Sequence, residues 1–330
     1  MPSSYIGFRF RYLNEQGKPT SFFYHQARID DSSGITLGTE SIAIADIQDA
    51  ALYGNQLAIS LRPFLALPKG VAENIIPNTS SFIIEVPDGL ATDAKSALDQ
   101  HRSALMAFAK KKKLTQEGKG YSFKAEQCPN CDAVIDLTGK KDTNYIYCKY
   151  CEIIFDKHKA LLPKSENYKV CPECNYYNRV QEYTEFHFYA LPKKRRASYQ
   201  SHICCDTCAQ RYHEQTAWRN VPYLIGIPFN FMLKNKMSKG INEFYQGLTE
   251  ANRFAQDGNI TEADVLYGLI LLRNEQHPAI LFNMAQAYYK SAQLDKAYRY
   301  FEKSLENCSN YQPALDFLEL HKEVKWFKLG

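Results

Sequence analysis

The cysteines are the residues of this chain whose type and spacing point most directly to chemistry. The chain has 330 residues and ten cysteines, nine of them between positions 128 and 208. Eight of the cysteines form four Cys-x-x-Cys pairs: Cys128 and Cys131, Cys148 and Cys151, Cys171 and Cys174, Cys205 and Cys208. Zinc binds four thiolates at the corners of a tetrahedron, and a Cys-x-x-Cys turn brings two sulfurs to one side of the ion. The spacing therefore predicts two structural zinc ions per chain.

The first two pairs are separated by sixteen residues that contain short alternating segments. We expect Ala133–Leu137 and Tyr145–Tyr147 to form a β-hairpin that joins the two pairs, with Ile153–Phe155 as a third strand. This arrangement, with the Cys-Pro-x-Cys turn that starts at Cys128, resembles a zinc ribbon. The resemblance covers residues 121–160.

The second set of ligands contains an ambiguity. We assign a second zinc ribbon to residues 165–215, in which thirty residues separate the two cysteine pairs. Cys204 directly precedes Cys205 and could replace it as a ligand. Two nearby histidines could supply nitrogen ligands, His202 and His213. We favour Cys205 because it keeps the Cys-x-x-Cys spacing of the other pairs, and the choice between the two cysteines stays open.

Catalytic motifs are missing from the sequence. A four-thiolate zinc ion leaves no position for water, and a redox Cys-x-x-Cys is expected once, at the start of a helix in a βαβ unit. The eight histidines are scattered, and the chain lacks His-Glu-x-x-His, Gly-x-Ser-x-Gly and phosphate-loop motifs. We therefore expect a protein that is not an enzyme and has no cofactor besides zinc.

Charge is distributed unevenly along the chain. The net formal charge is +4, but residues 1–100 carry −4, residues 101–240 carry +11 and residues 241–330 carry −3. The densest basic cluster lies among tyrosines and phenylalanines in the insert of the second ribbon, at Lys193, Lys194, Arg195 and Arg196. Lysines on phosphates and aromatic rings on bases are a common way to bind nucleic acid. Alternation over residues 182–189 fits equally well a long β-hairpin with a solvated basic tip.

Residues 1–114 predict a small β-rich domain. Alternating segments are expected to form strands near 5–13, 21–29, 35–38, 41–44, 47–53, 56–62 and 80–86. A helix follows, capped by Thr92 or Asp93 and ended by the four lysines at 110–113. Antiparallel strands closed by one helix resemble a pleckstrin-homology-like domain, a family that binds peptides and in some members phosphoinositides. Because the first hairpin lacks a basic cluster, we expect protein docking or plain packing.

The last 90 residues repeat with a period of 34. Ala251 aligns with Ala285, and Ala263 aligns with Ala297. Residues 283–305 closely resemble a tetratricopeptide repeat. We therefore expect an all-α region with two such repeats and a capping helix over 313–327.

The resemblance to tetratricopeptide repeats implies a peptide-binding groove lined by the first helix of each repeat. Carried over by register, the groove positions are Asn252, Gln256, Phe282, Gln286, Tyr289 and Lys290. The alternative is that the repeats only pack internally or dimerise. Because about three repeats are usually needed for stability, we expect these two to lean on residues 218–240 or on another subunit.

Residues 216–240 are expected to form an apolar connector. Its apolar stretch at 221–233 contains two prolines and a glycine, which interrupt a membrane-surface helix. Whether residues 218–236 touch a membrane stays open. No apolar run reaches the ~18 residues that span a bilayer, and the start of the chain shows no secretory signal. We expect a cytoplasmic protein.

These features lead to one hypothesis and one alternative. The hypothesis is a multidomain, non-catalytic zinc protein that recruits protein partners through its repeats (241–330) and N-terminal domain (1–114). The two zinc ribbons would form a rigid spacer between these parts. The alternative is a nucleic-acid-binding protein that uses the basic second ribbon. Oligomeric state is left open.

Overall fold

The structure is a computed structural model that describes residues 5–30, 34–161, 167–191, 194–220, 234–237, 239 and 241–321. Within these ranges the side chains are described for all residues except 185–199 and 216–220. The chain forms two compact units, residues 1–139 and residues 140–330. The apolar stretch 221–233 and residues 322–330 lie outside the described residues, and so do Lys193 and the end of the expected capping helix.

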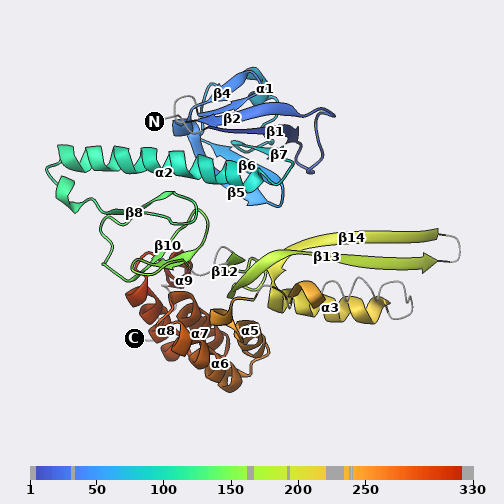
Figure 1. Cartoon of the computed structure of the whole chain (residues 1–330), viewed down its shortest axis with the longest axis vertical. Helices are drawn as coiled ribbons and strands as arrows, with labels where there is room; N and C mark the ends of the chain where they lie inside the picture. The colour runs from blue at the N-terminus through green and yellow to red at the C-terminus, as the bar shows by residue number, and fades with distance from the viewer. Residues whose placement is uncertain are drawn as a thin grey trace. The chain divides into compact units, whose positions relative to one another are not determined.

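An antiparallel sheet dominates the first unit, as the alternation in the sequence predicts (Figure 1). Its order is β4-β3-β2-β1-β7-β6-β5. The strands are β1 (Ile6–Leu13), β2 (His25–Asp30), β3 (Gly34–Leu37), β4 (Glu40–Ile42), β5 (Ile47–Tyr53), β6 (Gln56–Leu61) and β7 (Ser81–Glu85). Two short helices join them, η1 (Ile44–Asp46) and α1 (Lys69–Ala72). One face of each strand is buried, which the period of two requires.

Helix α2 (Ala91–Gln116) follows the last strand of the sheet. Its first half packs on the sheet through Ala94, Ala97 and Leu98, which belong to the same buried core as the strands. Neither expected residue caps it: the N-cap position is Leu90, and no side chain bonds there. The helix also continues beyond the four lysines at 110–113, because nothing in that run breaks a helix.

Helix α2 also contacts η2 (Gly120–Ser122) and the short strand β9 (Val134–Asp136), which pairs with β8 (Ala125–Gln127). The Ser103 hydroxyl accepts a hydrogen bond from the Val134 N–H at 2.8 Å. Lys110 forms an ion pair with Asp136. One lysine of the basic run therefore has a partner within its own unit.

Small hairpins in the middle of the chain pair differently from our expectation. Strand β8 pairs with β9, and β10 (Tyr145–Tyr147) pairs with β11 (Ile154–Asp156). The expected hairpin between Ala133–Leu137 and Tyr145–Tyr147 is wrong, since the described strands pair across each Cys-x-x-Cys turn instead. Each of the first three cysteine pairs thus closes its own hairpin.

A three-stranded sheet in the second unit contains the long insert of the second ribbon. Strand β12 (Tyr168–Val170) pairs with the start of β13 (Tyr177–Leu191), and β13 pairs along its length with β14 (Lys194–Cys205). Beyond β12 the two long strands continue together, with α3 (Asp206–Asn220) alongside (Figure 1). The expected long hairpin is therefore present in the backbone.

Helices form the C-terminal part of the second unit. After η5 (Glu243–Tyr245) come α5 (Leu248–Gln256), α6 (Ile260–Arg273), α7 (Pro278–Lys290), α8 (Leu294–Asn307) and α9 (Gln312–Leu320). Helix α8 begins and ends 34 residues after α6 begins and ends. The four alanines of the 34-residue pattern are buried, because small residues allow the helices to approach closely. The helical C-terminal region is as predicted.

One apolar core joins the helices to the ribbon strands. Tyr147, Tyr168 and Tyr177 belong to the same buried cluster as the helical residues Tyr245 and Phe282. The ribbon strands of the second unit are therefore packed into the repeats, and they do not form a spacer that stands apart from them. The segment 218–240, on which the repeats are expected to lean, lies mostly outside the described residues.

Candidate metal centres and the groove of the helical repeats

Two groups of four cysteines come together in the structure. In each group the four Sγ atoms lie within 4.8 Å of one another. The groups are Cys128, Cys131, Cys148 and Cys151, and Cys171, Cys174, Cys205 and Cys208. Tetrahedral zinc with Zn–S bonds of ~2.3 Å separates its sulfurs by ~3.8 Å. Cys174 Sγ and Cys205 Sγ are 3.6 Å apart, so the donor set and its spacing fit a metal ion of this kind.

Three of the four cysteine pairs share one backbone turn. In the first, Cys128 N–H donates to the Ala133 carbonyl at 2.9 Å, and Asp132 N–H donates to the Cys128 carbonyl at 3.0 Å. The same two bonds recur in the turns that begin at Cys148 and Cys171. The residue after the second cysteine has a positive φ each time: 57° at Asp132, 63° at Glu152 and 63° at Asn175. Three different sequences therefore adopt the same strained turn. In each, the turn brings the two cysteine sulfurs to one side, where they can bind a metal ion.

The fourth pair has a different geometry from the one we expected. Cys205 is the last residue of β14, and Cys208 lies in the first turn of α3. The pair therefore spans a strand-to-helix junction and is not a fourth knuckle. Cys205 N–H also donates to Cys171 Sγ at 3.3 Å. The start of a helix carries partial positive charge, which favours thiolates there.

Cys204 lies outside the second group in this structure. It is fully buried next to the group, and its side chain points to the other face of β14 from that of Cys205 because successive strand residues alternate. Burial raises the pKa of the Cys204 thiol, which keeps it protonated. Neither nearby histidine belongs to the group. The His202 ring stacks on Tyr212 at 4.3 Å.

A pair of buried asparagines on the helices binds the backbone that follows the third knuckle. Asn283 Oδ1 accepts from the Tyr177 N–H at 2.7 Å, and its Nδ2 donates to the Tyr177 carbonyl at 2.8 Å. Asn252 Nδ2 donates to the same carbonyl at 3.0 Å. Tyr267 donates to Asn252 Oδ1 at 2.7 Å and so fixes the orientation of that amide. Together these residues hold a short stretch of extended chain.

The other groove positions also contact their own chain. Gln286 Nε2 donates to the Asn175 carbonyl at 2.6 Å. The Lys290 ammonium lies 4.4 Å from the centre of the Tyr176 ring. Gln256 accepts from Arg211 of α3 at 2.7 Å. Four of the six groove positions implied by the family resemblance therefore contact residues 175–177 or α3 of the same chain.

Two further positions have aromatic neighbours on the helices. Phe282 is buried edge-on against Phe301 and Tyr311. Tyr289 packs on Phe317 at 4.9 Å and on His321 at 5.0 Å. These two residues belong to the helical packing.

Sequence reasoning missed Asn283 and Asn310. Asn310 repeats the bidentate contact at the second knuckle: its Oδ1 accepts from the Tyr147 N–H at 3.1 Å, and its Nδ2 donates to the Tyr147 carbonyl at 2.8 Å. For Asn283 the sequence does carry a signal, because this asparagine lies inside an apolar helical run, Ile280-Leu-Phe-Asn-Met-Ala285. A buried amide of this kind needs partners from elsewhere in the chain.

A buried ion pair ties the second ribbon to the residues before the helices. Arg179 on β13 contacts Asp206 at the start of α3, with Nη2 and Oδ2 2.7 Å apart and both side chains nearly inaccessible. Arg179 also donates to the carbonyls of Met237 and Lys239. Tyr183 donates to the other Asp206 oxygen. Sequence analysis did not identify this network.

The basic cluster of the second ribbon lies at the far end of the β13–β14 hairpin. Leu191 pairs with Lys194 in the last register position before the turn, and Ala190 pairs with Arg195. Lys193 lies outside the described residues, and the side chains of 194–196 are among those not described. The structure therefore places the backbone of residues 194–196 at the distal end of the paired strands.

The basic residues of the N-terminal sheet have acidic partners. Arg9 pairs with Asp88 at 2.6 Å, and Arg11 pairs with Glu85. The Arg11 guanidinium lowers the pKa of Glu85 through its hydrogen bond. These arginines are thus engaged by carboxylates of their own unit.

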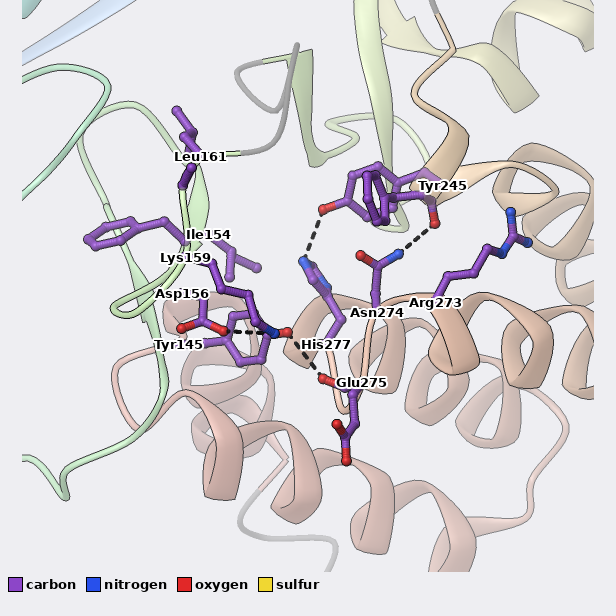
Figure 2. Close-up of a pocket in the computed structure, with 13 residues that line it drawn as sticks. Tyr145, Ile154, Asp156, Lys159, Leu161, Tyr245, Arg273, Asn274, Glu275 and His277 are labelled. Carbon is purple, nitrogen blue, oxygen red and sulfur yellow. Dashed lines mark hydrogen bonds and ion pairs between the residues drawn. The ribbon is translucent and has the colours of Figure 1, made fainter.

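A small cavity of about 280 Å³ lies between the end of β11 and the helices (Figure 2). Its polar groups bond to one another: Tyr145 donates to the Glu275 carbonyl at 3.1 Å, and Lys159 lies 3.3 Å from Asp156. His277 Nε2 contacts the Tyr245 hydroxyl at 3.1 Å. Burial lowers the pKa of His277 to about 3, so the ring is neutral.

Comparisons with protein-family models, curated proteins and solved structures find no match to this chain. Among the helices that the structure describes, none is both long enough and apolar enough to cross a bilayer.

Proposed function

We propose that this chain is a non-catalytic, zinc-stabilised interaction protein that recruits protein partners, and that its helical repeats hold extended peptide backbone. The observation that carries the proposal is the contact of Asn252 and Asn283 with both backbone polar groups of Tyr177. Amide side chains that pair with a backbone N–H and C=O can hold an extended peptide of almost any sequence. In this chain the segment held is an internal one.

Zinc is the metal that the two cysteine groups fit best. Four thiolates within 4.8 Å of one another suit a closed tetrahedral ion. A closed ion supplies folding energy and has no site for a substrate, which supports a structural role. The small hairpins around the cysteines have little core of their own, and this also favours metal as their main support.

The helical region supports the resemblance to tetratricopeptide repeats. The equal offset of α6 and α8 by 34 residues and the buried alanines at the helix crossings are the features of that family that the sequence carries. In the first unit, antiparallel strands followed by one long helix support the pleckstrin-homology-like assignment. Both resemblances imply protein binding.

A partner is expected to contact surfaces other than the filled groove. Full-length wild-type protein, loaded with two equivalents of zinc, would be used to capture partners from native extract by quantitative mass spectrometry. The matched control is the charge-reversal variant Lys111→Glu/Lys112→Glu, which changes an exposed part of α2 and keeps the fold. Reproducible protein partners that survive nuclease treatment support the proposal. Enrichment of nucleic acid alone contradicts it.

A second function is favoured by the shape of the hairpin. A two-stranded β-ribbon fits the major groove of DNA, and the basic residues of this hairpin lie beside its turn. The corresponding proposal is nucleic-acid contact by Lys193, Lys194, Arg195 and Arg196. A filter-binding titration at two salt concentrations tests it. Affinity that falls steeply with salt, and that falls further in Lys194→Glu/Arg195→Glu, supports this function.

A further inference from the structure

The contact between the third knuckle and the helices has the features of a peptide in a binding site. Three amides hold backbone atoms: Asn252 and Asn283 bind Tyr177, and Gln286 binds Asn175. Two adjacent aromatic side chains fill apolar space, since Tyr176 and Tyr177 are both buried to 2 % exposure or less. Backbone contacts give such a site affinity, and the pockets for the two rings give it specificity.

The second cysteine group determines where this segment lies. Asn175 follows the ligand Cys174 directly and takes the left-handed conformation that closes the knuckle. Cys171 N–H donates to the Tyr176 carbonyl at 2.9 Å, so the knuckle also fixes the residue between the two that the helices hold. The segment is therefore shaped for the groove while the knuckle is formed.

We propose that the metal ion at Cys171, Cys174, Cys205 and Cys208 controls access to a peptide site on the helices. While the knuckle holds metal, Asn175–Tyr177 fill the site in cis. When the metal leaves, the site accepts an external extended peptide that carries two adjacent aromatic residues. This inference rests on the proposed peptide-binding function of the helices and names its ligand class and its regulation.

The physical reason is the advantage of an attached and preformed ligand. A tethered segment acts at an effective concentration in the millimolar range, which a free peptide of similar affinity does not overcome. A knuckle without metal must be ordered before it can bind, and that ordering costs free energy. Removing metal thus lowers the competition from the internal segment and leaves Asn252 and Asn283 in place.

The test uses a fluorescent peptide with the sequence of residues 170–180 and serine at 171 and 174. Its binding to the full-length chain is measured by fluorescence anisotropy. Zinc-loaded wild type and zinc-loaded Cys174→Ser are compared, and Cys131→Ser serves as the control that disrupts only the first cysteine group. We expect Cys174→Ser to bind the peptide on the order of tenfold more tightly than wild type or Cys131→Ser. Adding Asn283→Ala should remove that gain.

Three results would overturn the proposal. One is equal affinity of wild type and Cys174→Ser. Another is a gain that persists in Cys174→Ser/Asn283→Ala, which would place the peptide elsewhere. The third is loss of the helical circular dichroism signal in Cys174→Ser, because the site would then require the metal for its own folding. None of these results bears on partner capture by the zinc-loaded wild type, which tests the proposed function separately.

Discussion

Asn283 pairs with both the N–H and the carbonyl of Tyr177, a residue 106 positions earlier in the chain. The side chain is fully buried, and it also donates to Asn252 at 2.9 Å. A single amide therefore bonds to two backbone groups at the start of β13, and the Asn252 amide shares the carbonyl. Asn310 makes the same pair of bonds to Tyr147. The second and third knuckles are therefore both held by an asparagine amide that bonds to the N–H and the carbonyl of one residue.

Asn283→Ala is expected to destabilise the second unit. The Tyr177 N–H would lose its acceptor in a buried setting, which typically costs about 1–3 kcal/mol. Chemical denaturation followed by circular dichroism measures the loss. Asn307→Ala is the matched control, because Asn307 is a half-buried asparagine whose amide donates to the Lys303 carbonyl of its own helix. Equal effects of the two substitutions would contradict the importance of the Tyr177 contact.

The metal content should be two ions per chain. Elemental analysis of Cys205→Ser is expected to return one ion, because that sulfur belongs to the second group. Cys204→Ser should retain both ions, since Cys204 lies outside the group. The opposite result for these neighbours would exchange their roles and would require β14 to shift by one residue.

Asp206→Ala should be strongly destabilising. It leaves the buried Arg179 guanidinium without its carboxylate, and breaking one side of a buried pair typically costs about 3–5 kcal/mol. Unfolding in urea, with zinc present throughout, measures the effect. Asp88→Asn removes the charge of the exposed pair with Arg9 and suits the positive φ of 64° at this position, so it should have little measurable effect. If the Asp206 variant lost no more free energy of unfolding than the Asp88 variant, Arg179 would have found other partners.

The stability of the second unit should fall in mild acid because of His277. Burial lowers the pKa of this ring to about 3, against an unfolded value of 6.5. Below pH 6.5 the unfolded chain therefore binds a proton that the folded chain does not, so the stabilising effect present at higher pH is lost as the pH falls. The expected loss between pH 7.5 and pH 5.5 is about 1 kcal/mol.

His277→Gln isolates this contribution. Any acid-induced loss of metal affects wild type and variant alike, so the difference between their pH dependences reports on the imidazole alone. Denaturant midpoints would be measured at pH 7.5 and pH 5.5. Identical pH dependence in the two proteins would show that His277 is not buried as the structure has it.

The parts of the fold that the sequence predicts are those that depend on local spacing. Cysteine pairs separated by two residues specify the metal groups, alternation specifies the strands of the first sheet, and the 34-residue period specifies helices α6 and α8. A small residue in the repeat pattern, such as Ala285, predicts that another helix packs closely at that position, even though the sequence does not identify that helix. Each of these signals is contained in a short window of sequence.

The parts that escaped prediction depend on distant partners. The family register selected Asn252 and Gln286 as peptide-binding positions, and these amides do bind backbone, but the segment they bind belongs to the same chain. No periodicity links Tyr177 to Asn283 or Arg179 to Asp206, since each pair is joined only by the packing of the whole second unit. The pairing of the small hairpins was wrong because strands of three residues carry too little alternation to specify a partner.

Because the β13–β14 hairpin is long, a small rotation at its base displaces its far end by a large distance. Its 12 register pairs run from Val180 and Cys205 to Leu191 and Lys194. At ~3.3 Å per residue the last pair lies ~36 Å from that first pair, so a rotation of ~5° at the first pair moves the last pair by ~3 Å. One strand of the pair ends on a sulfur of the second cysteine group. The direction of the distal, basic end of the hairpin therefore depends on the geometry of the cysteine group at its base.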